Sequence, residues 1–397
     1  MQDARVPDVT SDRIVDFDFF KVPSADGDLH KAWKKLHDGP DVIYTPKNGG
    51  HWIMTRADNI RRVFEDHQRF SNRGVAMTLE PREMQLSPGE VDQPQHTGFR
   101  QLLNPLFGPK QIAALEEEAR RLARELINGF RNDGGCEFRI AFAQKMPIYV
   151  FLTIMKLPIE HAEALLPAAD LLSRDPDQES FLRAMNTMMG YLSERIDERL
   201  KSPKDDFISY LLESRLDGKP LTKLQVLGTT SNVMFGGLDT VVGSMQFYMN
   251  FLARSPSHRK QLLENPGSTG EAVEELLRRF PIANFGRVAD VDINEADYGV
   301  PIRAGDLVLL PSTLANLDER RFADPLTVDF NRTDKKHLSF GTGIHRCLGV
   351  HLARLELRVM LEEWLPLIPE FRIRQDEEVG TLSGRINSMT YLPLAWN

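Results

Sequence analysis

Apolar and charged residues recur with helical spacing through most of the chain between residues 111 and 254. Within 111–130, apolar side chains return every three or four positions and charged ones cover the other face, which predicts an amphipathic helix. Comparable patterns predict further helices over residues 141–155, 159–173, 179–201, 205–216 and 221–254. The last segment is apolar on more than one face, so we expect it to be a central, buried helix.

Short apolar runs bounded by turn residues predict strands in three places. Two runs near residues 40–55 flank a glycine-rich turn and indicate a β-hairpin. A second small sheet is expected within 286–310, from the runs at 286–288, 298–300 and 307–310. Residues 383–394 indicate another hairpin. The fold class is therefore mainly α with small β-sheets, and we expect a single domain over residues 1–397, because no internal repeat or linker interrupts the pattern.

Composition and charge narrow the possible functions. The chain has 397 residues, of which 41% are hydrophobic and 27% charged, which is the balance of a globular protein. The formal net charge of −8 disfavours nucleic acid and an anionic membrane as partners. The longest strongly apolar run, at 146–155, is far shorter than the roughly 20 residues that span a bilayer. With no apolar signal region at the N-terminus, we expect a cytoplasmic protein, and a monomer.

Residues 73–92 carry glycines and prolines with scattered Met and Leu, and no periodic pattern. A loop of this length in a compact domain is usually functional or disordered. We therefore expect this segment to form a lid over a pocket.

The chain has only two cysteines, which excludes a disulfide framework and a zinc site of several cysteines. Cys136 follows a helix-stop signal and is expected to be a small apolar residue. Cys347 follows Gly341 and Gly343, precedes Gly349, and lies directly before an apolar helical pattern, so we place it at a helix N-terminus. The helix dipole and free N–H groups there favour a thiolate, which could be a metal ligand or a nucleophile. The alternative is one more buried small residue.

Gly236 and Gly237 lie inside the long central helix, where each glycine costs up to about 1 kcal/mol relative to alanine. A locally opened helix pressed against a ligand would offset that cost. Asp239 and Thr240 follow them and suit a proton relay into a dry site. The alternative is that Thr240 donates to the carbonyl of Gly236 and Asp239 is solvated. The two interpretations are about equally weighted on these residues alone.

Two polar pairs have helical spacing. Glu275 and Arg278 lie three residues apart on one face, and as a surface pair they would contribute only a few tenths of a kcal/mol. His96 and Arg100 lie one turn apart after a helix-start signal. Two donors facing one way suit a pair of carboxylates, although an ordinary surface helix start explains them as well.

The stretch around Cys347 resembles the cysteine-ligand loop of the haem-thiolate monooxygenases, the cytochrome P450 family. The family pattern F-x-x-G-x-H/R-x-C-x-G has all its fixed residues here, at Phe340, Gly343, His345, Cys347 and Gly349. Residues 236–240 match the oxygen-activating G-G-x-D/E-T segment of the same family. From about residue 234 to the end, the chain resembles the bacterial camphor-hydroxylase branch.

This resemblance implies a single-domain cytochrome P450 fold that binds haem b, with Cys347 as the iron ligand. Thr240 would hydrogen-bond the oxygen being activated, and Asp239 would gate proton delivery to it. Residues implied to contact the haem or its propionates are His96, Arg100, Arg287, His345, Phe340, Gly341, Gly236 and Gly237. Glu275, Arg278 and Arg332 would form the family's structural cluster behind the cysteine loop.

The resemblance also implies a substrate pocket, for which the candidates are Met84, Phe235, Ile282, Ala283, Ile386 and Met389. The camphor enzyme has a tyrosine that donates to the substrate ketone, at the place where Met84 falls here. A thioether cannot donate that bond, so camphor is disfavoured. We expect hydroxylation or epoxidation, with O2, of a small hydrophobic substrate, namely a larger or less polar terpenoid such as a norisoprenoid.

The electron source is expected outside the chain, because no dinucleotide-binding fingerprint is present. The resemblance implies a two-iron two-sulfur ferredoxin with a flavin-dependent reductase, docking near Arg100, Lys110 and Arg346. An alternative is a peroxide-driven hydroxylase or a haem-based ligand sensor, against which the intact Asp239–Thr240 pair argues. A helical binding protein with an incidental cysteine is a third, non-enzymatic possibility.

Overall fold

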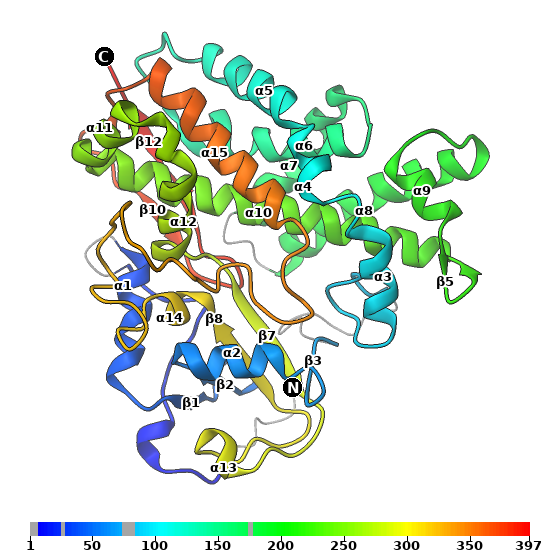
Figure 1. Cartoon of the computed structure of the whole chain (residues 1–397), viewed down its shortest axis with the longest axis vertical. Coiled ribbons are helices and arrows are strands. Elements are labelled where there is room, and N and C mark those ends of the chain that lie inside the picture. The colour runs from blue at the N-terminus through cyan, green and yellow to red at the C-terminus, as the bar shows by residue number, and fades with distance from the viewer. Residues whose placement is uncertain (1–6, 25–27, 74–83, 174–177) are drawn as a thin grey trace.

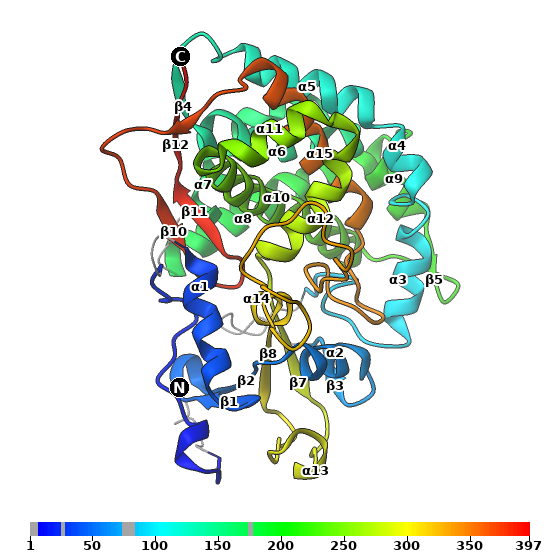
Figure 2. The same cartoon turned by 60° about the vertical axis from the view of Figure 1, so that its left-hand side comes forward.

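The computed structural model describes residues 7–24, 28–73, 84–173 and 178–397. Residues 74–83 of the expected lid at 73–92 therefore lie outside the described residues. The longer helices gather in one region of the molecule and the largest sheet lies in another (Figures 1 and 2). The helices are α1 (Leu29–Lys34), α2 (Ala57–Glu65), α3 (Gln95–Leu103), α4 (Pro109–Ala113), α5 (Glu116–Asn128), α6 (Lys145–Ile154), α7 (Ala162–Ser173), α8 (Gln178–Lys201), α9 (Phe207–Glu213), α10 (Lys223–Arg254), α11 (Pro256–Glu264), α12 (Thr269–Arg279), α13 (Glu295–Tyr298), α14 (Ser312–Asn316) and α15 (Val350–Leu367).

Helix α10 is the central helix that the sequence predicts. It begins with a capping box, in which the Thr222 hydroxyl accepts from the Gln225 N–H and the Gln225 side chain accepts from the Thr222 N–H. It packs against α6, α8 and α15, so more than one of its faces is buried. The helix continues without a break through Gly236 and Gly237, so the expected local opening is wrong.

Five strands form one sheet in the order β1-β2-β8-β7-β3. Their bounds are β1 Val42–Thr45, β2 His51–Met54, β3 Phe70–Ser71, β7 Asn284–Ala289 and β8 Leu307–Pro311. The predicted β1–β2 hairpin is confirmed. The expectation of a separate second sheet is wrong, because β8 pairs in parallel with β2, with Trp52 opposite Val308. The pairing satisfies backbone groups of β2 that would otherwise form an open edge.

Three smaller sheets complete the β structure. They consist of β4 (Gly135–Glu137) with β12 (Pro393–Ala395) and β9 (Arg372–Ile373), β10 (Gly380–Leu382) with β11 (Ser388–Tyr391), and β5 (Arg215–Leu216) with β6 (Lys219–Pro220). The predicted hairpin at 383–394 is therefore only partly right: β11 pairs with β10, while β12 leaves it to pair with β4. The expected strand at 298–300 is wrong, because the short helix α13 ends there at Gly299 with φ of 73°.

Helix α15 and the loop before it are fixed by a single large core that joins the two regions. Helix α15 packs against α5, α10 and α12, and its fully buried Trp364 lies against Phe130, Phe138 and Trp396. Cys136 is buried in β4, and burial raises the pKa of its thiol to about 12, which fits the small apolar role expected of it. Among the described residues, no helix is long and apolar enough to cross a membrane.

Candidate active site

A cavity of about 380 Å³ lies between α10, α3, the start of β7 and the loop that carries Cys347. It brings together most of the residues singled out from the sequence. Those that line it are His96, Arg100, Gly236, Gly237, Thr240, Ile282, Ala283, Phe340, His345, Cys347 and Ile386. These residues are spread over about 290 positions of the chain, so only the fold brings them together.

The other predicted site residues do not line the cavity. They are Met84, Phe235, Asp239, Arg287, Gly341 and Met389. Phe235 and Asp239 are on α10, each one residue before Gly236 and Thr240, so they lie about 100° round the helix from the stripe that lines the cavity. Met84 lies against α10 near Gly228, about two turns before Gly236. Met389 is fully buried in β11, and its N–H donates to the side chain of Gln246.

The cysteine loop is held in a tight turn by its glycines and by one backbone bond. Gly341 and Gly343 have φ of 62° and 73°, and a Cβ at Gly343 would lie 2.6 Å from the Phe64 carbonyl oxygen. Both positions therefore require glycine. The Cys347 N–H donates to the Phe340 carbonyl at 3.0 Å, which turns the thiol toward the cavity.

The chemistry of the Cys347 thiol favours one of its two possible roles. The residue lies just before α15, whose N-cap is Gly349. Removal from water raises the pKa of the thiol, while the Gly349 N–H and the charges of Arg100 and Arg346 act in the opposite direction. A thiol with a raised pKa is a poor nucleophile, whereas a metal cation would ionise it outright. The geometry therefore suits a metal ligand better than a nucleophile.

Facing the cysteine loop, α10 offers a bare surface. An added Cβ at Gly236 or Gly237 would meet nothing within 4 Å, and Gly349 on the opposite wall is equally open. Thr240 lines the cavity one turn beyond Gly236, and its hydroxyl donates to the Gly236 carbonyl at 2.7 Å. The back-bond that the sequence left open is thus present, and the Thr240 oxygen can still accept a proton or a hydrogen bond from the cavity.

A second wall carries donors that lack partners. His96 and His345 lie with their ring centroids 4.2 Å apart. Neither ring nitrogen of His96, nor Nε2 of His345, has a hydrogen-bond partner among the described residues. Burial lowers the pKa of His96 to about 4 and that of His345 to about 3, so both rings are neutral and each carries one N–H to donate.

Two arginines lie beside these histidines. Arg287 is buried, its guanidinium donates to the Gly286 carbonyl at 2.6 Å, and it lies 5.1 Å from the centre of the Phe64 ring. No described carboxylate forms an ion pair with it. Burial lowers the pKa of Arg287 to about 10. Arg100 lines the cavity and donates to the Arg346 carbonyl at 3.1 Å. A buried cation without a counter-charge lowers stability, and an anionic ligand in the cavity would supply that charge to Arg287 and Arg100.

Haem b fits this set of residues. In the described parts of the chain, no three His, Cys, Asp or Glu side chains gather into a ligand set for a bare metal ion. One cysteine suits an iron that a porphyrin already ligates. The unpartnered donors suit the two propionates, and the bare glycine surfaces leave room for a flat ring.

Several lining residues escaped the sequence reasoning, the polar ones being Asn232, Ser244, Asn284, Ser339, Glu356 and Arg385. Asn232 lies two turns before Thr240 on α10, so helical spacing back from the threonine would have found it. Glu356 interrupts the apolar face of α15. It is 1% exposed, its Oε2 atom has no partner, and burial raises its pKa to about 8.

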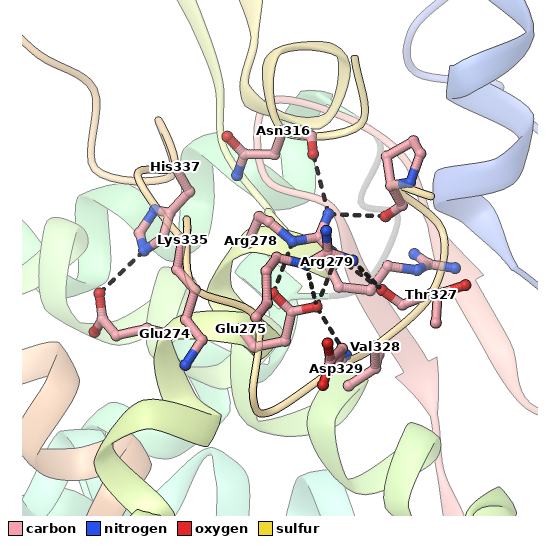
Figure 3. Close-up of polar contacts among 12 residues, drawn as sticks. Glu274, Glu275, Arg278, Arg279, Asn316, Thr327, Val328, Asp329, Lys335 and His337 are labelled. Carbon is pink, nitrogen blue, oxygen red and sulfur yellow. Dashed lines mark hydrogen bonds and ion pairs between the residues drawn. The ribbon is translucent and has the colours of Figure 1, made fainter. Parts of the chain in front are cut away.

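Behind the cysteine loop, Glu275 and Arg278 on α12 form a fully buried pair (Figure 3). Arg278 donates from Nε and Nη2 to the two carboxylate oxygens, both at 2.8 Å. Its remaining donors bind the carbonyls of Asn316, Pro325 and Thr327. Arg332 adds a bond from Nε to Glu275 at 3.1 Å. The pair is therefore a closed network in the core and not the surface pair considered from spacing alone.

Comparison with known proteins gives consistent matches over most of the chain. The family model described as Cytochrome P450 matches residues 151–267 and 268–382. A protein described as probable cytochrome P450 127A1 from Sinorhizobium fredii is 36% identical, covering 94% of this chain and 91% of its own length. The mycinamicin IV hydroxylase/epoxidase of Micromonospora griseorubida is 32% identical, over 81% of this chain and 83% of its own.

Two solved structures resemble this one closely. The crystal structure of cytochrome P450 CYP101C1 superposes with a TM-score of 0.92 at 36% identity, covering 99% of this chain and 100% of its own. That of CYP101J2 superposes with a TM-score of 0.88 at 35% identity, with the same coverage. The fold and the likeness to the camphor-hydroxylase branch that the sequence predicts are confirmed.

Proposed function

The chain belongs to the cytochrome P450 family, and we propose that it hydroxylates or epoxidises a small hydrophobic, terpenoid-like substrate with electrons from a ferredoxin. Proteins of this family are monooxygenases that bind haem b through a cysteine thiolate. One observation carries the proposal. A single cavity joins the lone thiol of Cys347, the unpartnered donors of His96 and His345, and a largely apolar chamber under α10.

In this proposal Cys347 holds the iron, and His96, Arg100, Arg287 and His345 bind the propionates. The neutral imidazoles would donate hydrogen bonds, while the arginines would supply charge. The haem, when bound, supplies the activation of O2 and the oxidation of the substrate. The protein contributes position, exclusion of water and control of protons.

Thr240 is the proton-handling group at the cavity surface. Its hydroxyl is oriented by the bond to the Gly236 carbonyl, which leaves the oxygen lone pairs facing the cavity. Asp239 precedes it, half-buried and outside the lining. We propose that Asp239 passes protons inward from the outer side of α10 and that Thr240 receives and positions them.

The chamber favours an apolar substrate, because its walls include Phe151, Val233, Val241, Ile282 and Ile386. We propose a terpenoid larger or less polar than camphor, such as a norisoprenoid. The related mycinamicin enzyme is named as a hydroxylase/epoxidase, which is consistent with either reaction here.

We propose a two-iron two-sulfur ferredoxin, reduced by a flavin-dependent reductase, as the electron donor. Arg346 and Lys110 are exposed beside the cysteine loop and could meet an acidic partner. Arg100 is half-buried and lines the cavity, so it suits the propionates better than docking. We also propose that residues 1–397 form one domain, which is supported by the single core cluster.

The deciding test is the visible spectrum of the reduced protein with carbon monoxide. We expect a strongly red-shifted Soret band in the wild type, and its loss in Cys347→His. Cys136→Ser is the matched control and should keep the band, because that thiol is buried in β4. A wild type loaded with haem but lacking the band would overturn the thiolate assignment. Turnover with ferredoxin compared with peroxide then tests the electron source.

A further inference from the structure

Asn232 is an isolated polar residue in the apolar chamber. It lies on α10 between Ser231 and Val233, and it lines the cavity together with Val233. Its side-chain amide makes no hydrogen bond with any residue that the structure describes. Because Asn232 is half-buried and lines the cavity, a molecule bound there can meet its amide.

Two other neutral polar side chains of the chamber are already hydrogen-bonded to the protein. Thr240 donates to the Gly236 carbonyl. Asn284 donates its amide to the Gly384 carbonyl at 2.6 Å. Unlike these two, Asn232 keeps its N–H donors available to a bound molecule.

Gly89 lies directly against the Asn232 amide in the cavity lining. A Cβ placed at Gly89 would lie 2.8 Å from Oδ1 of Asn232, so the amide oxygen rests against the bare backbone there. Gly89 is itself held, because its carbonyl accepts from Asn72 at 2.9 Å. With the oxygen against Gly89, the NH2 group of Asn232 is the end left to the chamber.

The distance along α10 sets the shape of the molecule that Asn232 can hold. Asn232, Gly236 and Thr240 are spaced by four residues each, so they form one stripe facing the cavity. Eight residues at 1.5 Å each put Asn232 about 12 Å from Thr240 along the helix axis. An atom bound by Asn232 is therefore at the far end of a substrate whose reacting carbon lies beside Thr240.

We propose that Asn232 is the specificity-determining residue that orients the substrate, by donating a hydrogen bond to a carbonyl oxygen remote from the oxidised carbon. The substrate class is accordingly an elongated terpenoid ketone, of which a norisoprenoid ketone is an example. A compact bicyclic ketone carries its oxygen too close to its other carbons to reach both places. This inference rests on the proposed function and gives its substrate a polar end.

The test compares two ligands in holoenzyme: a C13 norisoprenoid ketone, and the hydrocarbon of the same skeleton with CH2 in place of the carbonyl. Binding is measured by the shift of the Soret band, which does not depend on turnover. Asn232→Leu should weaken ketone binding about 3- to 10-fold, the value of one neutral hydrogen bond, and leave the hydrocarbon's affinity unchanged. Val233→Ala, beside it on the same wall, should weaken both ligands alike.

Two further variants sharpen the test. Asn232→Asp keeps the shape of the side chain but removes its donor. The affinity for the ketone should therefore fall, while the affinity for the corresponding alcohol should be retained, because the alcohol can donate to the carboxylate. Gly89→Ala would place a Cβ 2.8 Å from the amide oxygen, so the Asn232 side chain must shift and the affinity for the ketone should fall selectively.

Each remaining outcome overturns the inference. Equal losses for ketone and hydrocarbon, or no loss in Asn232→Leu, would reject Asn232 as the donor and leave the proposed function standing. If the wild type shows the carbon monoxide band but neither ligand shifts its Soret band, the substrate class fails together with the inference, while the haem-thiolate assignment stands.

Discussion

The Glu275 network and the cavity beside Cys347 are two buried polar regions of one core, and their hydrogen bonds differ. In the Glu275 network, the donors of Arg278 are met by the carboxylate and by three backbone carbonyls. In the cavity, both nitrogens of His96 and one of His345 lack partners among the described residues, and no described carboxylate pairs with Arg287.

This difference separates a structural role from a binding role. A closed network of buried charges fixes the loop that it binds, because breaking any member leaves an uncompensated charge. Buried donors without partners lower the stability of the ligand-free protein. Their presence is explained if a ligand accepts their hydrogen bonds. The comparison therefore predicts opposite signs for substitutions in the two regions.

The largest effect is expected from opening the closed network. Glu275→Gln leaves Arg278 without its buried counter-charge, and should lower the free energy of unfolding by about 3–5 kcal/mol, measured by urea denaturation. Glu271→Gln is the matched control on the same helix, because its pair with Lys335 is at 2.8 Å but its carboxylate is 72% exposed. A loss below 1 kcal/mol is expected there. Equal losses in both variants would reject the contrast.

A pH-dependent effect of intermediate size is expected at Glu356, whose carboxyl is buried beside the cavity. Burial raises its pKa from 4.5 to about 8. Below about pH 4.5 the group is neutral in the folded and the unfolded chain, and its contribution to stability is fully present. Between pH 4.5 and 8 the folded chain keeps a proton that the unfolded chain has lost, so stability falls as pH rises.

Glu356→Gln should remove this fall, and at pH 7 it should be more stable than the wild type by about 3 kcal/mol, with no such gain at pH 4. Urea denaturation across this range measures the difference, and a carboxylic-acid C=O band in the infrared, lost in the variant, identifies the group. A difference between the two proteins that does not change with pH would contradict a raised pKa.

A smaller effect, with opposite signs in two states, is expected at His96. His96→Leu removes two unsatisfied nitrogens, so the free energy of unfolding of the haem-free protein, measured by urea denaturation, should rise by about 1–2 kcal/mol. Haem transfer to an acceptor globin should nevertheless become faster, because a propionate loses a donor. His161→Leu is the control: this ring is bonded to the Tyr191 hydroxyl at 2.7 Å, so its loss should leave haem transfer unchanged.

The smallest effect on stability is expected at Thr240. Its hydroxyl is intermediate between the two regions, because it donates to one protein carbonyl and can still accept a hydrogen bond from the cavity. Thr240→Val removes the bond to Gly236 and should cost less than about 1 kcal/mol. The fraction of consumed reducing equivalents that appears as product should fall, with more hydrogen peroxide released. Thr240→Ser keeps the hydroxyl, so most of the reducing equivalents consumed should still appear as product. If that fraction is the same in Thr240→Val as in the wild type, Thr240 does not handle protons.

Much of the fold and part of the site could be predicted because their signals are local. The periodicity of 221–254 predicts α10, and the turn residues near 40–55 predict the β1–β2 hairpin. Gly341 and Gly343, which precede Cys347, have the positive φ that glycine adopts readily, whereas Gly349, which follows it, has φ of −84°. Such features depend on neighbours within one or two turns, which the sequence lists directly.

Tertiary structure alone decided which distant segments meet. The parallel pairing of β2 with β8 joins residues about 250 positions apart, and no local pattern specifies it. Spacing placed Glu275 and Arg278 on one face, but only the packing of α12 made that face the interior. Likewise the cavity includes Asn232 and Glu356 and leaves out Met84, because the path of the backbone sets which side chains share a space.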